Sequence, residues 1–322
     1  MEVIVNLPGL SLHPGTGTHW WKSIGFAEQV ETARTLERLG YDTIQVPEHI
    51  VMHPSLIPRS GPFWVHSLSA AGFILGATST IKVACMVVVP YHHPIELAKA
   101  LATLDHLSGG RLVVVALTGW SEWEFETLGV PFASRDAMTA EVVDAMVTLW
   151  TSESPSFHGE LVSFDEIVFE PKPFQEHLPV WLGGKTKRAL SQVAERGDGW
   201  LAYDTPRSRV PEMLAHLHAE QERLDRRVTI GISLPLYDGR RDPVTHVVVE
   251  PPKVVLEASA VLEQAREVAG LGATVTDANV PLGTSVYQTD GPDAPPATRS
   301  LSDYLERLHW FAESALPGIH AL

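Results

Sequence analysis

Two hydrophobic patterns alternate along the chain from one end to the other. Short unbroken apolar runs, such as 81–89, are typical of parallel strands buried on both faces. Between them, apolar residues recur every three or four positions, as on the buried face of a helix. The predicted strands are 3–7, 41–46, 81–89, 111–117, 180–182, 199–203, 228–234 and 273–280. The predicted helices lie within 26–36, 65–78, 94–104, 138–149, 190–194, 211–224, 255–269 and 301–312.

Eight strands, each followed by a helix, predict a (β/α)8 TIM barrel formed by one domain, 1–322. Glycine and proline delimit these elements: Pro8-Gly9 ends the first strand, and Gly109-Gly110 end the helix that begins at Pro94. An open doubly wound sheet is the alternative, and it would carry a dinucleotide fingerprint in its first strand–helix turn. That turn contains Gly15-x-Gly17 without the third small residue, so the closed barrel is favoured.

Three segments interrupt the alternation and are predicted to be insertions after strands four, seven and eight. Segment 155–175 resembles a hairpin, 237–252 is polar and contains Arg240-Arg241, and 285–298 is rich in Pro, Gly and Asp. They leave the eight units intact, so the barrel remains the expected fold.

Charge and composition narrow the classes of partner. The chain carries 24 Lys and Arg against 39 Asp and Glu, a formal net charge of −15, which disfavours nucleic acid and anionic membrane surfaces. It has no apolar run of about 18 residues, and its start lacks the basic region of a signal peptide. The single cysteine, Cys85, allows no internal disulfide, so a reducing cytoplasmic location is expected.

Candidate chemistry follows the second predicted strand. In a barrel of this kind the active site lies at the carboxyl ends of the strands, where the chain has Pro47-Glu48-His49. His49 would serve as a general acid, a general base or a hydrogen-bond donor to a flavin-type ring, because imidazole exchanges protons near neutral pH. A loop or capping histidine is the alternative.

The fourth predicted strand is followed by Thr118-Gly119-Trp120 and then by Glu122 and Glu124. Gly119 would let the backbone approach a flat ring closely, and Trp120 would stack on the ring or form a wall of the pocket. Glu122 or Glu124 would take a proton or hold a hydroxyl group. The alternative is an acidic helix N-terminus, which the helix dipole stabilises without any catalytic role.

The fifth predicted strand ends in Gly183-Gly184-Lys185-Thr186, which predicts an anion site, most simply for a phosphate. An ATP-binding P-loop is excluded because its first glycine would fall on Pro179. The adjacent His92 and His93 fit no compact metal site, and we predict no metal. A phosphate site beside an aromatic mouth suits a phosphorylated cofactor with a planar ring.

Several of these strings resemble the bacterial luciferase-like monooxygenase superfamily, and most closely its branch that depends on the deazaflavin coenzyme F420. The strings are Pro90-Tyr91-His92-His93-Pro94, Leu107-Ser108-Gly109-Gly110-Arg111-Leu112, Gly119-Trp120-x-Glu122-x-Glu124-Phe125, Trp181-Leu182-Gly183-Gly184 and Gly197-Asp198-Gly199-Trp200. They cover roughly residues 40–200 densely, and the remainder is similar in architecture.

The resemblance implies a TIM barrel with a flavin or deazaflavin at its C-terminal mouth. Glu48 and His49 would contact the ring, Glu122 or Glu124 would lie near the reacting carbon, and Gly183 to Thr186 would hold the phosphate. Met86, Val87 and Val88 would lie behind the ring, with a non-prolyl cis peptide bond between Met86 and Val89. Relatives also suggest a homodimer.

Three functions remain open from the sequence. The first is F420-dependent hydride transfer to or from a small organic substrate, and the second is monooxygenation with reduced FMN and O2. The third is a cofactor-free binding barrel, favoured by Ala116 and Thr118, which would narrow the ring pocket where relatives usually carry glycine. The intact 183–186 segment argues against the third. Loop aromatics that would line an apolar substrate pocket, or serve only as hinge packing, are Trp20, Trp21, Phe63 and Trp64.

Overall fold

The computed structural model describes residues 1–12, 18–202, 205–234, 257–279 and 298–322. Eight parallel strands form a closed barrel, which confirms the predicted TIM fold. In the order in which they are hydrogen-bonded around the barrel, the strands are β1 (Glu2–Asn6), β12 (Val275–Asp277), β11 (Thr229–Ser233), β10 (Gly199–Leu201), β9 (Val180–Gly183), β6 (Leu112–Leu117), β5 (Lys82–Val88) and β3 (Thr43–Val46).

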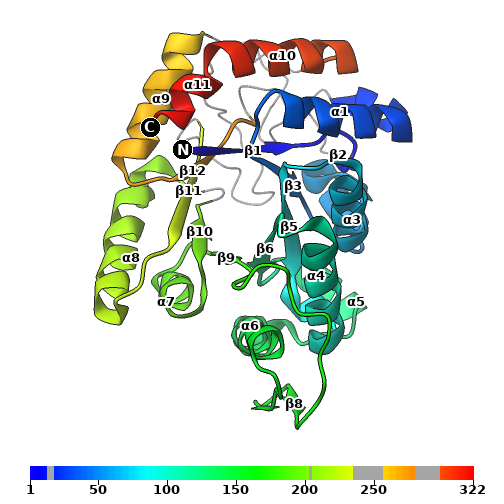
Figure 1. Ribbon diagram of the computed structural model, residues 1–322, viewed down its shortest axis with the longest axis vertical. Helices are drawn as coiled ribbons and strands as arrows, with labels where there is room; N and C mark the ends of the chain where they lie inside the picture. The colour runs from blue at the N-terminus through cyan, green and yellow to red at the C-terminus, as the bar shows by residue number, and fades with distance from the viewer. Residues whose placement is uncertain (13–17, 203–204, 235–256, 280–297) are drawn as a thin grey trace.

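Helices form the outer layer, and Figure 1 shows them as a ring around the strands. The helices that follow the barrel strands are α1 (Phe26–Arg38), α3 (Ser67–Ala77), α4 (Pro94–Ser108), α6 (Arg135–Thr151), α7 (Lys187–Arg196), α8 (Val210–Leu224), α9 (Ala258–Gly270) and α10 (Leu301–Ser314). Three shorter α-helices are α2 (Ile57–Ser60), α5 (Glu122–Thr127) and α11 (Leu316–His320). The amino group of Met1 donates to the carbonyl of Ile319 at 3.0 Å, so the two ends of the chain lie side by side.

Two small antiparallel ladders lie outside the barrel. Strands β2 (Ser11–Leu12) and β4 (Phe63–Trp64) pair next to the mouth, and β7 (Phe157–His158) pairs with β8 (Ser163–Phe164). The second ladder falls within the predicted hairpin-like segment 155–175, and the Glu141 carboxylate on α6 anchors it by accepting the amides of Leu161 and Val162 at 2.6 Å each. The predicted insertions 237–252 and 285–298 lie outside the described residues, apart from Thr298.

The strands bury side chains on both faces. One apolar cluster fills the barrel interior, and a larger one lies between the barrel and the helices. On β5, Ala84 and Met86 belong to the interior cluster, whereas Val83, Cys85 and Val87 belong to the outer one. This alternation follows from the two-residue period of a strand, and it turns Val87 away from the barrel mouth.

Strand β5 is regular to its end, which corrects one expectation. Val87 pairs with Ala116 and Val88 with Leu117 in an uninterrupted parallel ladder, and the Val88 amide donates to the Glu48 carboxylate at 2.5 Å. The peptide bonds from Met86 to Val89 are trans. Among the described residues the cis peptide bond is Glu170–Pro171. The expected non-prolyl cis bond behind the ring is therefore wrong.

The Ser108-Gly109-Gly110-Arg111 string, which begins at the last residue of α4, has a structural role. Gly109 ends the helix in the left-handed conformation, with φ of 69°. The Arg111 guanidinium then donates to three carbonyl oxygens, those of Leu75 at 2.7 Å, Ile81 at 3.1 Å and Thr78 at 3.2 Å. These contacts connect the end of α3 to the start of β6. The Ser-Gly-Gly-Arg string, one of the strings shared with the luciferase-like superfamily, therefore stabilises the barrel and does not contribute to the mouth pocket.

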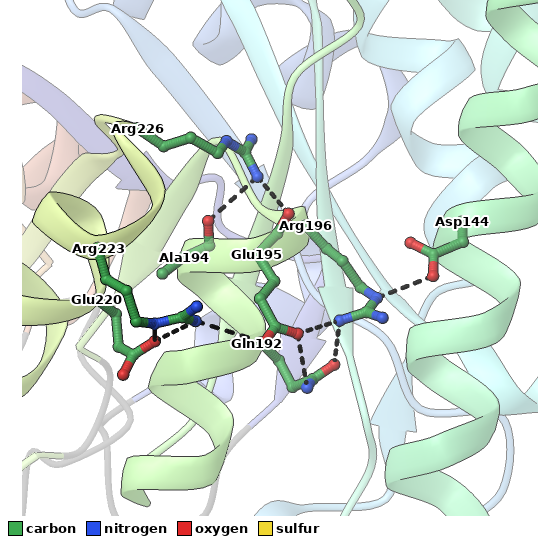
Figure 2. Close-up of polar contacts among 8 residues, drawn as sticks. All are labelled: Asp144, Gln192, Ala194, Glu195, Arg196, Glu220, Arg223 and Arg226. Carbon is green, nitrogen blue, oxygen red and sulfur yellow. Dashed lines mark hydrogen bonds and ion pairs between the residues drawn. The ribbon is translucent and has the colours of Figure 1, made fainter.

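A polar network attaches α7 to its neighbours (Figure 2). Arg196 on α7 donates to Asp144 on α6 at 2.9 Å and to Glu195 at 2.6 Å. From the other side, Arg226, just after α8, donates to the Ala194 carbonyl at 3.1 Å. Because α7 follows the predicted anion-binding loop, these contacts help to fix the position of that loop. No helix in the described ranges has the length and apolar character needed to cross a membrane.

Candidate active site

A cavity of about 460 Å³ opens at the carboxyl ends of β1, β3, β5, β6 and β9. Ten of the residues predicted to be catalytic or cofactor-binding line it, and so do the loop aromatics Trp21 and Trp64. The ten are Glu48, His49, Met86, Val88, Thr118, Gly119, Trp120, Gly183, Gly184 and Lys185. We call this cavity the mouth pocket, and its size is within the range of small-molecule sites.

His49 and Glu124 form a hydrogen-bonded pair beside this pocket. Nδ1 of His49 lies 2.8 Å from Oε2 of Glu124, whose side chain is fully buried. The other carboxylate oxygen accepts the amides of Ile50 at 2.7 Å and Val51 at 3.2 Å. Burial raises the pKa of Glu124, but the hydrogen bonds from His49 and these amides outweigh it, so the pKa lies below the ordinary value. Glu124 is therefore an anionic acceptor, and the proton of the pair resides on Nδ1.

Aromatic side chains hold the His49 ring at the pocket wall. Trp64 and Trp120 meet it edge-on, with ring centroids 4.5 Å and 5.5 Å from the imidazole. Nε2 of His49 makes no hydrogen bond to any residue that the structure describes. With Nδ1 protonated, neutral His49 would present Nε2 as a proton acceptor, and the imidazolium would present it as a donor.

Glu48 contributes to the pocket wall, but its carboxylate is used within the protein. It accepts the Ser67 hydroxyl at 2.6 Å and the Val88 amide at 2.5 Å, and Nε2 of His92 lies 3.1 Å away. Its side chain is fully buried. This arrangement gives Glu48 a positioning role, because it joins the end of β3 to the end of β5.

The other four residues predicted to be catalytic or cofactor-binding do not line the mouth pocket. Glu122 is exposed at the first position of α5, while Glu124, two residues later, is buried beneath His49. Val87 packs in the outer apolar cluster. Thr186 lies at the start of α7, where its hydroxyl caps the helix by accepting the Ala189 amide at 3.1 Å.

Position 119 favours glycine for two reasons, its left-handed backbone conformation and the lack of room for a side chain. Its φ is +77°, and a Cβ there would lie 2.6 Å from Phe125 and 2.7 Å from Val88. The sequence suggested that this glycine allows a ring to approach. The structure adds a packing reason, because Gly119 is held between a β5 side chain and an α5 side chain.

The predicted anion-binding loop is fixed from below by a buried tryptophan. Trp200 on β10 donates from Nε1 to the Gly184 carbonyl at 3.1 Å, and its side chain is fully buried. Gly184 has φ of +146°, and a Cβ there would lie 2.4 Å from the Cβ of Ala189. Arg209 donates to the Lys185 carbonyl at 3.1 Å. The backbone course of the loop is therefore set by contacts within the protein.

Sequence reasoning missed several polar residues of the pocket. Asn6 at the end of β1, Gln45 within β3 and Tyr91 after β5 all line it. Burial raises the pKa of Tyr91, and the neighbouring Glu124 carboxylate raises it further. Asn6 was detectable as the polar residue of the predicted strand 3–7, and Gln45 as one of several polar residues in the predicted strand 41–46. Tyr91 carried no such signal.

Outside the lining of the mouth pocket, a buried carboxyl group that the sequence did not single out lies at the end of β12. Asp277 accepts the Asn279 amide at 3.2 Å and is hydrogen-bonded by the Ser233 side chain. Burial raises its pKa to about 6, against the lowering effect of these hydrogen bonds.

The structure also revises the expected narrowing of the ring pocket. Ala116 belongs to the outer apolar cluster and faces the helices, so its side chain takes no space from the mouth pocket. Thr118 does line the pocket. Ala116 therefore gives no support to a cofactor-free barrel. Within the described residues, no group of three His, Cys, Asp or Glu side chains is placed to hold a metal ion.

Comparison with known proteins identifies relatives of this chain. An uncharacterized protein of Mycobacterium tuberculosis is 39% identical in an alignment of 193 residues that covers 54% of this chain and 66% of the relative. The FMNH2-dependent dimethylsulfone monooxygenase of Pseudomonas putida is 32% identical over 137 residues, 42% of this chain and 38% of that enzyme. The chain thus spans under two thirds of the length of these relatives.

A solved structure of an F420-dependent secondary alcohol dehydrogenase, in complex with an F420–acetone adduct, superposes with a TM-score of 0.69. It is 16% identical, with coverage of 99% of both chains, and supports the fold alone. The family model described as luciferase-like monooxygenase matches residues 1–268. The chain is therefore a member of the luciferase-like monooxygenase family, built on a closed eight-stranded barrel.

Proposed function

We propose that this protein is an F420-dependent oxidoreductase that transfers hydride to or from a small organic substrate. The observation that carries the proposal is the His49–Glu124 pair at the mouth pocket. Interconversion of an alcohol and a carbonyl moves one proton with each hydride. His49 has one ring nitrogen held by a buried carboxylate and the other without a partner among the described residues, as that proton transfer requires.

The residues present fit a phosphorylated cofactor with a flat ring. The pocket volume of about 460 Å³ and its tryptophan walls suit a planar ring. Because Gly183 has no side chain, the space beside Leu117 stays open. A Cβ at position 183 would fill it and lie 3.2 Å from Cδ2 of Leu117. Gly183, Gly184 and Lys185 would meet the phosphate, and Thr186 would keep the adjoining helix capped.

When bound, the deazaflavin supplies or accepts the hydride. The protein's residues orient the reactants and handle the proton. Nε2 of His49 would donate it to a carbonyl oxygen or take it from an alcohol, while Glu124 keeps the imidazole oriented. Trp64 and Trp120 would limit water at the imidazole.

Monooxygenation with reduced FMN and O2 is the second candidate function. The observation that favours it is the 32% identity to an FMNH2-dependent dimethylsulfone monooxygenase over 137 residues. Both cofactors share a ring of similar shape and a phosphate, so the mouth pocket would accept either.

Titration of the purified protein with F420 and with FMN, followed by fluorescence, tests the proposal. We expect saturable F420 binding and F420-coupled oxidation or reduction of small alcohols or ketones. A His49→Gln variant should bind F420 normally but lose about 10² to 10⁴-fold in kcat. Binding of reduced FMN alone would favour the second candidate, and binding of neither cofactor would favour a cofactor-free barrel.

A further inference from the structure

A second cavity, of about 560 Å³, lies between α6 and α7 on the outer side of β6 and β9. We call it the α6–α7 cleft. Its apolar lining consists of small or medium side chains, among them Ala116 and Leu182 from the barrel wall and Ala140 from α6. The Arg196–Asp144 ion pair shown in Figure 2 joins the two helices.

The α6–α7 cleft adjoins the mouth pocket at the predicted phosphate loop. Thr118, Gly183, Gly184 and Lys185 line both cavities, whereas Thr186 lines only the cleft. A ligand whose ring lies in the mouth pocket and whose phosphate meets this loop could therefore continue into the cleft.

The cleft carries four basic and four acidic side chains in a chain whose formal net charge is −15. Two of the acids are already compensated: Asp144 pairs with Arg196 at 2.9 Å, and Glu141 accepts two backbone amides. Asp136 and Glu160 remain as exposed acids.

Arg188 is the basic residue best suited to a ligand. It is exposed, lines the cleft, and makes no hydrogen bond or ion pair within the described part of the chain. Arg135 is partly committed, since its guanidinium stacks on Phe132 at 3.8 Å and donates to the Phe132 carbonyl at 2.9 Å. The free guanidinium of Arg188 fits a carboxylate or phosphate.

We propose that the α6–α7 cleft binds the carboxylate-bearing chain that extends beyond the phosphate of F420, with Arg188 as its main ionic contact. This inference rests on the proposed F420-dependent function. FMN ends at its phosphate and would leave the cleft unused, whereas the phosphate of F420 is a diester that continues into a lactyl and glutamyl chain. The cleft would thus select for the deazaflavin by its tail, independently of the ring.

The experiment compares two ligands by fluorescence titration: F420 with its glutamyl chain, and the same deazaflavin phosphodiester lacking the glutamates. We expect the wild-type protein to bind the glutamylated form about tenfold more tightly, the effect of one charge-assisted contact. Arg188→Glu should abolish that difference and leave the affinity for the short form nearly unchanged. Arg38→Glu on α1 changes the net charge equally at an exposed site far along the chain and should preserve the difference.

A second variant tests the cleft without changing charge. Ala140→Leu should lower the affinity for the glutamylated form several-fold and spare the short form, and thermal unfolding of each variant verifies that it is folded. Equal wild-type affinity for the two forms, or an equal loss for both in Arg188→Glu, would overturn the inference while F420 binding itself stands. Absence of binding of either form would overturn the proposed function and this inference with it.

Discussion

Nδ1 of His49 lies 2.8 Å from Oε2 of Glu124, although 75 positions separate the two residues in the chain. The same carboxylate also accepts the amides of Ile50 and Val51. One buried side chain from α5 therefore fixes both the ring and the backbone of the loop after β3. The pocket-facing imidazole depends on an acid that does not itself line the mouth pocket.

Replacing Glu124 with Gln should impair the proton transfer that we assign to His49. The amide keeps the size of the side chain but removes the charge and can donate to Nδ1, which disfavours the Nδ1-protonated tautomer. We expect kcat to fall about 10²-fold or more, with a changed pH profile and little change in cofactor affinity. Glu122→Gln is the matched control, since Glu122 is exposed and should tolerate the change. If the two changes lowered kcat equally, Glu124 would have no specific role in proton transfer by His49.

Replacing Trp200 with Phe should loosen the loop predicted to bind phosphate. The change deletes the donor to the Gly184 carbonyl, and we expect the unfolding free energy to fall by about 1–3 kcal/mol and cofactor affinity to fall as well. Trp150→Phe provides the control, because buried Trp150 donates to the Ala98 carbonyl at 3.0 Å, away from the mouth pocket. That variant should lose stability and keep cofactor affinity. If both variants bound cofactor normally, Trp200 would be a purely structural residue.

Replacing Arg111 with Lys should destabilise the scaffold. An ammonium group cannot reach all the carbonyl oxygens that the guanidinium contacts at the end of α3, so buried acceptors would lose their donors. We expect a loss of about 2–4 kcal/mol in urea-induced unfolding. Arg38→Lys, at an exposed position on α1, should change stability by less than about 0.5 kcal/mol. A stable Arg111→Lys protein would contradict the assigned role.

Replacing Asp277 with Asn should change how stability depends on pH. The pKa of Asp277 is raised from 3.8 to about 6 in the folded protein, so its contribution is fully present below pH 3.8 and is lost as the pH rises through 6. The variant should therefore gain up to about 3 kcal/mol over the wild type as the pH increases from about 4 to 7. Urea unfolding of both proteins across this range measures the difference. A difference independent of pH would mean that Asp277 titrates normally.

The sequence by itself determined the fold and about half of the residues that line the mouth pocket. Continuous apolar strands, spaced apolar helices and the turn residues between them specify eight strand–helix units, because both periods follow from local backbone geometry. Since the carboxyl ends of parallel barrel strands meet at one face, the order of the strands alone assigns residues as distant as His49 and Gly183 to a common site.

The tertiary structure alone decided how individual side chains divide between roles. Glu122 and Glu124 are two positions apart on α5, and a helix turns about 200° over two residues, so only the packing of α5 could show which acid meets His49. Ala116 was expected in the ring pocket but faces the helices, since strand register sets which alternate residues point inward. Glu48 lines the mouth pocket, where it was expected, and its buried carboxylate also accepts hydrogen bonds from Ser67 and Val88, contacts that exist only once the barrel has closed.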